Sequence, residues 1–112
     1  MDDRKVLLSR AAELAGEFLD GLPDRPVGPP VDLAALRSEL NRPLAERGED
    51  PRAVLEELVS GVEQGLVGSA GPRYFGFVVG GGVPAALAAD WLTSAWDQNA
   101  GLFALSPSAA VV

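Results

Sequence analysis

The chain has 112 residues, no cysteine, no histidine and a formal net charge of -7. The lack of cysteine excludes a disulfide framework and a thiolate nucleophile, and the lack of histidine removes the commonest general base and metal ligand. The acidic balance argues against a nucleic acid or an anionic membrane as a partner, and we expect no bound metal. The start, MDDRKVLL, is unlike a signal peptide, and Asp90 interrupts the longest apolar run. We therefore expect a soluble, cytoplasmic protein.

Residues 1–70 are predicted to form an amphipathic helical arm. Between about Asp3 and Leu22, apolar residues recur at three- and four-residue steps, which predicts a helix with one apolar face. Asp50-Pro51 combines a capping carboxylate with a proline in the first turn and predicts the start of another helix. That helix should end near Gly65–Gly68.

A proline-rich strap, PDRPVGPP, occupies residues 23–30 between these helices. Proline cannot continue a helix, and four prolines in eight positions stiffen the backbone, so we expect an extended strap. Asp32 should then cap a short helix, LAALRSEL, that stops near Asn41.

Residues 71–112 differ sharply in composition, because their only charged residues are Arg73, Asp90 and Asp97. Both tryptophans and the only tyrosine also lie in this part of the chain. A domain surface needs polar residues on its outer side, and this segment supplies very few. We therefore expect residues 71–112 to be covered by other protein.

The order of elements in this apolar segment can be predicted from its pattern. Arg73 to Val79 is rich in aromatic and β-branched residues, which predicts a short extended segment. Pro84 should start a helix that runs to Trp96 and, being apolar nearly all round, should be buried on most sides. Leu102 to Leu105 is expected to be extended. No charge, cap or glycine closes the last residues, so we expect a segment truncated at Val112.

Residues 80–85, GGGVPA, formally match the dinucleotide-binding pattern G-x-G-x-x-A after a predicted strand. Such glycines let backbone amides approach a pyrophosphate at a helix N-terminus. However, no acidic residue ends a second strand about 20 residues further on. Pro84 also removes one of the donating amides. A tight reversal of the backbone is the favoured reading of the three glycines.

A composite pattern in the apolar segment resembles the N-terminal part of the group II pyridoxal-phosphate-dependent amino-acid decarboxylases, a family that includes the aromatic-L-amino-acid, tyrosine, histidine and glutamate decarboxylases. The elements of the pattern, in order, are Pro72-Arg73-Tyr74-Phe75, Gly80–Gly82, Pro84, Ala89-Asp90, Asn99–Gly101 and Ser106-Pro107. The likeness covers the chain from Pro72 onward, and the helical arm before it fits loosely.

The resemblance implies a mostly α chain: a helical arm plus a short extended segment of the aspartate-aminotransferase-like (type I) fold, but not a complete domain. Family members are homodimers that use pyridoxal 5'-phosphate to remove the α-carboxylate from an amino-acid substrate. The substrate pocket would be lined by Phe77, Val78, Val79 and Gly80. The pocket of the partner subunit would be approached by Asn99, Gly101, Leu102 and Phe103.

The departures from the family concern the cofactor. The family's cofactor lysine, its ring-stacking histidine and its aspartate on the pyridine nitrogen all lie beyond the Ser-Pro motif, and Lys5 is the only lysine here. Gly71 stands where the family often has histidine. We therefore expect a chain that is inactive by itself, either a fragment of a decarboxylase or a truncated paralogue. The competing hypothesis is a non-enzymatic helical module that binds a partner through residues 71–112.

Three residues of the apolar helix are candidates for functional groups, namely Asp90, Trp91 and Trp96. Asp90 could be a functional carboxylate, although a buried acid satisfied by a helix cap or by Arg73 is favoured. Trp91 and Trp96 are interpreted as packing residues rather than as a stacking platform.

Overall fold

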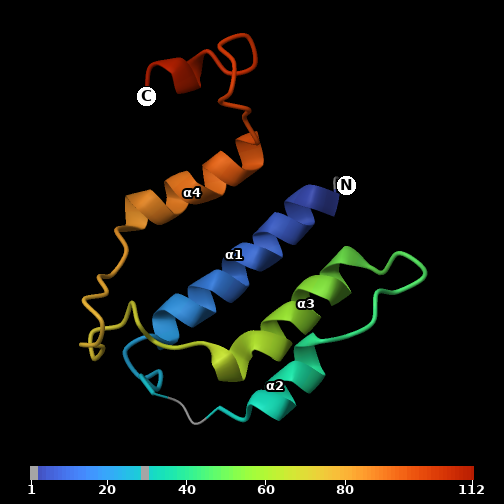
Figure 1. The fold of residues 1–112 in the computed structure, drawn as a ribbon, viewed down its shortest axis with the longest axis vertical. Helices are drawn as coiled ribbons and strands as arrows, with labels where there is room; N and C mark the ends of the chain where they lie inside the picture. Colours follow the sequence, from blue (N-terminus) through green and yellow to red (C-terminus); the bar gives the residue numbers. More distant parts are fainter. Residues whose placement is uncertain (1–2, 29–30) are drawn as a thin grey trace. The chain divides into compact units, whose positions relative to one another are not determined.

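The computed structural model describes residues 3–28 and 31–112. Its elements, in chain order, are α1 (Asp3–Gly21), α2 (Leu33–Leu40), α3 (Pro51–Val62), η1 (Glu63–Gly65), α4 (Pro84–Trp96) and η2 (Ser108–Ala110). Figure 1 labels the four α-helices. No strand occurs in the two described ranges, so the expectation of a mostly α chain is confirmed. The chain divides into two compact units, Met1–Gly80 and Gly81–Val112, which are called unit 1 and unit 2 below.

The helices begin where the sequence predicts because their capping residues act locally. The Asp32 carboxylate accepts hydrogen bonds from the N–H groups of Ala34 and Ala35 at 2.9 and 3.2 Å. The Asp50 carboxylate accepts one from the N–H of Ala53 at 3.0 Å. Each carboxylate satisfies donors that the first turn of a helix leaves unpaired. Pro84 is the first residue of α4, where its missing N–H costs nothing.

In unit 1, helix α3 contacts both α1 and α2. It runs parallel to α1, because Arg10 of α1 binds Glu56 of α3 while the later residue Arg25 binds Glu63, just after α3 (Figure 1). It runs antiparallel to α2, since Leu36 of α2 meets Gly65 of η1, just after α3, and the later residue Leu40 meets Gly61 of α3.

Two glycines four positions apart let α2 approach α3 closely. A Cβ atom on Gly61 would lie 3.0 Å from Cδ2 of Leu40, and one on Gly65 would lie 3.0 Å from Cδ2 of Leu36. Residues four apart lie on the same side of a helix, so the two leucines of α2 pack over a strip without side chains. Gly61 is buried by this contact.

Apart from such contacts, the described residues of neither unit enclose a hydrophobic core. Their only buried residues are Gly61, Gly68 and Ser106. The chain itself does not supply the predicted burial of the helix at residues 84–96. In α4, Leu92 is 49% exposed and Trp96 is 61% exposed. Unit 2 contains no second long element that could cover them.

The proline-rich strap is more strongly folded at its start than predicted. Residues 22–24 form a turn in which the N–H groups of Asp24 and Arg25 donate to the carbonyl of Gly21 at 3.1 and 3.0 Å. Hydrogen bonds to the free carbonyl at the end of α1 therefore determine the backbone here, rather than the preference of proline for extended conformations. Pro29 and Pro30 lie outside the described residues.

Both predicted extended segments are wrong, because each forms a turn instead. In the first, the N–H of Val79 donates to the carbonyl of Gly76 at 3.3 Å, so the chain reverses between them. In the second, the N–H groups of Leu105 and Ser106 both donate to the carbonyl of Leu102, at 3.0 and 3.2 Å. β-Propensity describes fit to a pleated sheet, and no neighbouring strand is present in the described chain.

None of the described helices has both the length and the apolar character that a membrane span requires.

Candidate functional site

The predicted pocket-edge residues form a strained turn at the end of unit 1. Its two central residues, Phe77 and Val78, have φ values of 57° and 55°. Left-handed backbone costs an L-residue roughly 1–2 kcal/mol, and it is especially rare for a β-branched residue. Both side chains point into solvent, since Phe77 is 92% exposed and Val78 is 104% exposed relative to a reference chain. This strained turn, residues 76–79, holds two of the three non-glycine residues with positive φ in the described part of the chain.

The residues just before the turn hold its base. The N–H of Tyr74 donates to the carbonyl of Gly71 at 3.4 Å. The Tyr74 side chain then covers Gly76 so closely that a Cβ there would lie 3.1 Å from the phenol oxygen and 3.2 Å from Cζ. Gly76 therefore provides the space in which the tyrosine lies.

Arg73 ties this region to the turn after α1. Its Nε donates to the carbonyl of Pro23 and its Nη2 to the carbonyl of Arg25, both at 2.8 Å. The hypothesis that Asp90 is a buried acid satisfied by a helix cap or by Arg73 is wrong, because Asp90 is exposed on α4. A carboxylate that remains in water needs no such partner.

Arg25 is itself held by two further groups of unit 1. Its guanidinium carbon lies 4.5 Å from the centroid of the Phe18 ring, and its Nη2 donates to Oε1 of Glu63 at 2.7 Å. The Arg25 side chain is only 14% exposed. The sequence pattern did not point to Arg25, because Glu63, its ion-pair partner, lies 38 positions further along the chain.

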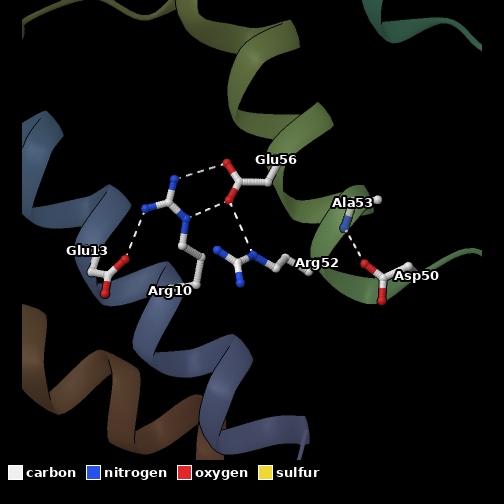
Figure 2. Close-up of polar contacts among 6 residues, drawn as sticks. All are labelled: Arg10, Glu13, Asp50, Arg52, Ala53 and Glu56. Atoms are coloured by element: carbon white, nitrogen blue, oxygen red, sulfur yellow. Dashed lines mark hydrogen bonds and ion pairs between the residues drawn. The ribbon is translucent and has the colours of Figure 1, made fainter.

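A second charged cluster joins α1 to α3 (Figure 2). Arg10 donates to both carboxylate oxygens of Glu56, at 2.5 and 3.2 Å, and also to Glu13 at 3.0 Å. The hydrogen bonds from Arg10 lower the pKa of the Glu56 carboxyl, and the nearby charge of Arg52 acts in the same direction. The same bonds raise the pKa of Arg10, so the pair stays ionised over the ordinary range. Because these side chains form hydrogen bonds and ion pairs with one another, we assign them a structural role.

The predicted partner-pocket residues follow α4 in unit 2. Asp97 ends the helix with a φ of 46°, in the left-handed region typical of a C-terminal cap. Asn99 then makes a local turn in which its side-chain oxygen accepts a hydrogen bond from the N–H of Gly101 at 3.0 Å. Leu102 and Phe103 follow with 64% and 70% of their surface exposed. This Asn99–Phe103 turn presents apolar side chains to the outside.

The two predicted groups of site residues thus belong to different units. Phe77, Val78, Val79 and Gly80 end unit 1, while Asn99, Gly101, Leu102 and Phe103 belong to unit 2. Each group is formed by local contacts within its own unit. In the described ranges, no cluster of acidic side chains could hold a metal ion.

The residues of this chain do not fit pyridoxal phosphate by themselves. The cofactor needs an amine for its aldehyde and a carboxylate near its ring nitrogen. Lys5 supplies the only side-chain amine, and it is exposed on α1. A shallow hollow at the start of α1 is lined by Asp3, Val6, Leu7, Asp50, Pro51 and Arg52, without Lys5.

Comparison with known proteins identifies no relative: neither a family model, nor a curated protein, nor a solved structure matches this chain. The functional predictions from the sequence therefore remain predictions.

Proposed function

We propose that this chain is the N-terminal part of a pyridoxal-phosphate-dependent amino-acid decarboxylase, a homodimeric carboxy-lyase of the type I fold. The composite pattern from Pro72 to Pro107 is the observation that carries the proposal. A series of short motifs in fixed order is more specific than any one of them, in particular more specific than the three glycines alone.

The strained turn supports a role at the pocket edge. Strained backbone is retained where the surrounding structure enforces it, and such positions gather at ligand sites. In the proposed enzyme, Phe77 to Gly80 would form an apolar wall against the substrate side chain. Their contribution would be to shape the pocket and exclude water, while the cofactor chemistry would come from residues outside this chain.

The uncovered apolar surface of unit 2 supports a role inside a larger assembly. Leu102, Phe103 and the exposed face of α4 present large side chains to solvent. Apolar surface of this extent marks an interface in a soluble protein. In the proposed homodimer it would be covered by the rest of the enzyme, and the Asn99–Phe103 turn would reach the pocket of the partner subunit.

The same exposed surface also favours the second candidate, a non-enzymatic module that binds a partner through residues 71–112. The dinucleotide-binding hypothesis lacks comparable support, because the strand required before its glycine loop is replaced by the turn at residues 76–79. Decarboxylase and module differ in one testable respect, which is whether a lysine for the cofactor is encoded together with this chain.

The experiment is to determine the coding sequence that follows Val112 and to express the complete product. The proposal predicts a Ser/Asn-x-x-Lys-type segment and a protein whose absorption spectrum shows bound pyridoxal phosphate as a Schiff base. Residues 1–112 alone should show no such band when the cofactor is added. A stoichiometric band that Lys5→Ala abolishes would contradict the proposal, and a frame without a cofactor lysine would favour the module.

A further inference from the structure

The segment just before the strained turn is fixed to the turn after α1 at several points. A Cβ on Gly71 would lie only 2.8 Å from the carbonyl oxygen of Leu22, so the two backbones are in direct contact. The N–H of Gly68 donates to the carbonyl of Pro26 at 3.4 Å. The shortest bonds in this contact are the two from Arg73.

The positions of the two acceptor carbonyls around Arg73 match the donors of a guanidinium. Its Nε and Nη2 reach two carbonyls that are two residues apart, those of Pro23 and Arg25. A guanidinium holds its donors in a rigid planar fork, whereas the ammonium of lysine is a single point with rotating donors. Among the described residues, both acceptors of the Arg73 side chain are backbone carbonyls, so the shape of the fork, rather than charge pairing, determines the contact.

The acceptor side of this contact is also held in place. Arg25, whose carbonyl accepts one bond, has its side chain between the Phe18 ring and the Glu63 carboxylate. A chain of contacts therefore runs from α1 and η1 through Arg25 to Arg73. Only Tyr74 and Phe75 separate Arg73 from the strained turn, and the Tyr74 ring packs on Gly76, its first residue.

We propose that Arg73 is a positioning residue that fixes the wall formed by Phe77 to Gly80 relative to the helices of unit 1, an inference that rests on the proposed decarboxylase function. Left-handed backbone at Phe77 and Val78 persists only where neighbouring contacts enforce it. Arg73 and Tyr74 supply those contacts on the N-terminal side of the turn. On the other side, a Cβ on Gly80 would meet nothing within 4 Å.

The first test is amide hydrogen exchange on the 112-residue chain, with Arg73→Lys and Arg73→Gln as variants. Both should speed exchange of the Tyr74 and Val79 amides about threefold to tenfold, the range expected when an exposed hydrogen bond is lost. Exchange in α3 should not change. Arg47→Lys, in the exposed segment between α2 and α3, is the control and should change nothing. Unchanged exchange at Tyr74 and Val79 in Arg73→Lys would overturn the proposal, as would equal acceleration throughout α3.

The second test uses the full-length decarboxylase and separates positioning from general stability. Arg73→Lys should raise KM about threefold to tenfold for an amino acid with a large side chain and leave kcat within about twofold. A purely structural role would lower kcat for all substrates alike and would overturn the proposal. If the full-length protein decarboxylates no amino acid, the proposed function fails, while the exchange measurement still decides whether Arg73 holds the turn.

Discussion

The two units of this chain are built by different kinds of contact. In unit 1, charged and polar side chains join elements that lie far apart in the sequence, as in the Arg10–Glu56 pair and the bonds from Arg73 to residues 23 and 25. In unit 2, the side-chain hydrogen bonds join residues at most four positions apart, for example Thr93 to Ala89. Unit 2 nevertheless carries most of the large exposed aromatic side chains of the chain.

The difference shows that long-range polar contacts and large apolar surfaces can occur in different parts of one chain. Unit 1 has enough long-range contacts to define how its helices lie, although none of its described hydrophobic residues is buried. Unit 2 has the apolar surface that could drive folding, at about 25 cal/mol per Å² buried, but nothing of its own to bury it against. We infer that its stabilisation comes from other protein.

The largest expected effect concerns the exposed face of α4. Leu92 and Trp96 lie four positions apart on this helix and are 49% and 61% exposed. The wild-type chain should therefore self-associate, and the double variant Leu92→Lys/Trp96→Lys should weaken association at least about 100-fold, because burying two such side chains contributes roughly 3–6 kcal/mol. Size-exclusion chromatography with light scattering measures this.

Leu44→Lys is the matched control for that experiment, because Leu44 is 98% exposed in unit 1 and should not contribute to association. A wild-type chain that is a monodisperse monomer, binds no hydrophobic dye and melts cooperatively would contradict the contrast between the units. It would favour a self-contained interaction module.

A smaller effect is expected where two backbones touch in unit 1. Gly71→Ala places a Cβ 2.8 Å from the Leu22 carbonyl oxygen, and relieving this contact requires the backbone to move. We expect a loss of about 1–3 kcal/mol in the free energy of unfolding, the usual cost of overpacking. Urea unfolding followed by circular dichroism, in the Leu92→Lys/Trp96→Lys background, measures it.

Gly16→Ala is the matched control, since a Cβ at Gly16 of α1 would meet nothing within 4 Å. This substitution should stabilise unit 1 by about 0.5–1 kcal/mol, because alanine is the better helix former. If both substitutions had the same sign, the close approach at Gly71 would not describe the protein in solution.

The smallest expected effect is a dependence of unit-1 stability on pH. The hydrogen bonds from Arg10 hold the pKa of Glu56 below its ordinary value of 4.5. The unfolded chain therefore binds this proton at higher pH than the folded chain does. The contribution of Glu56 is fully present above about pH 4.5 and is lost as the pH falls through its lower folded pKa.

Glu56→Gln should flatten this acid limb of the stability curve, and Arg10→Gln should do the same because it removes the other partner. Melting temperatures between about pH 3 and pH 7 provide the measurement, again in the lysine double-variant background. An acid limb that is identical in the wild type and in both variants would show that the pair contributes nothing measurable, as many exposed ion pairs do.

The helices could be predicted from the sequence because their signals are local. Asp32, Asp50 and Pro84 act within one turn of their own positions, and each helix starts where its signal predicts. The turn at Phe77 and Val78 could not be predicted, because the two residue types favour strands. Its backbone is enforced by Tyr74 and by Arg73, whose partners lie 48 and 50 positions away in the sequence.

The structure explains one departure from the family pattern, the glycine at position 71. Gly71 stands where the resembling decarboxylases often have histidine, and the sequence alone offers no explanation. Here a side chain at this position would collide with the carbonyl of Leu22. The local path of the backbone in unit 1 thus requires glycine.

The central claim is that Phe77 to Gly80 line the substrate pocket of a decarboxylase, and Val78→Phe in the full-length enzyme tests it most directly. Since the Val78 side chain is fully exposed in this chain, a larger one should cost little stability here but should narrow the pocket. The ratio of kcat/KM for a small and a large amino acid should shift about 10- to 200-fold toward the small one, with the melting temperature nearly unchanged. An unchanged ratio with a lowered melting temperature would assign Val78 to packing and contradict the claim.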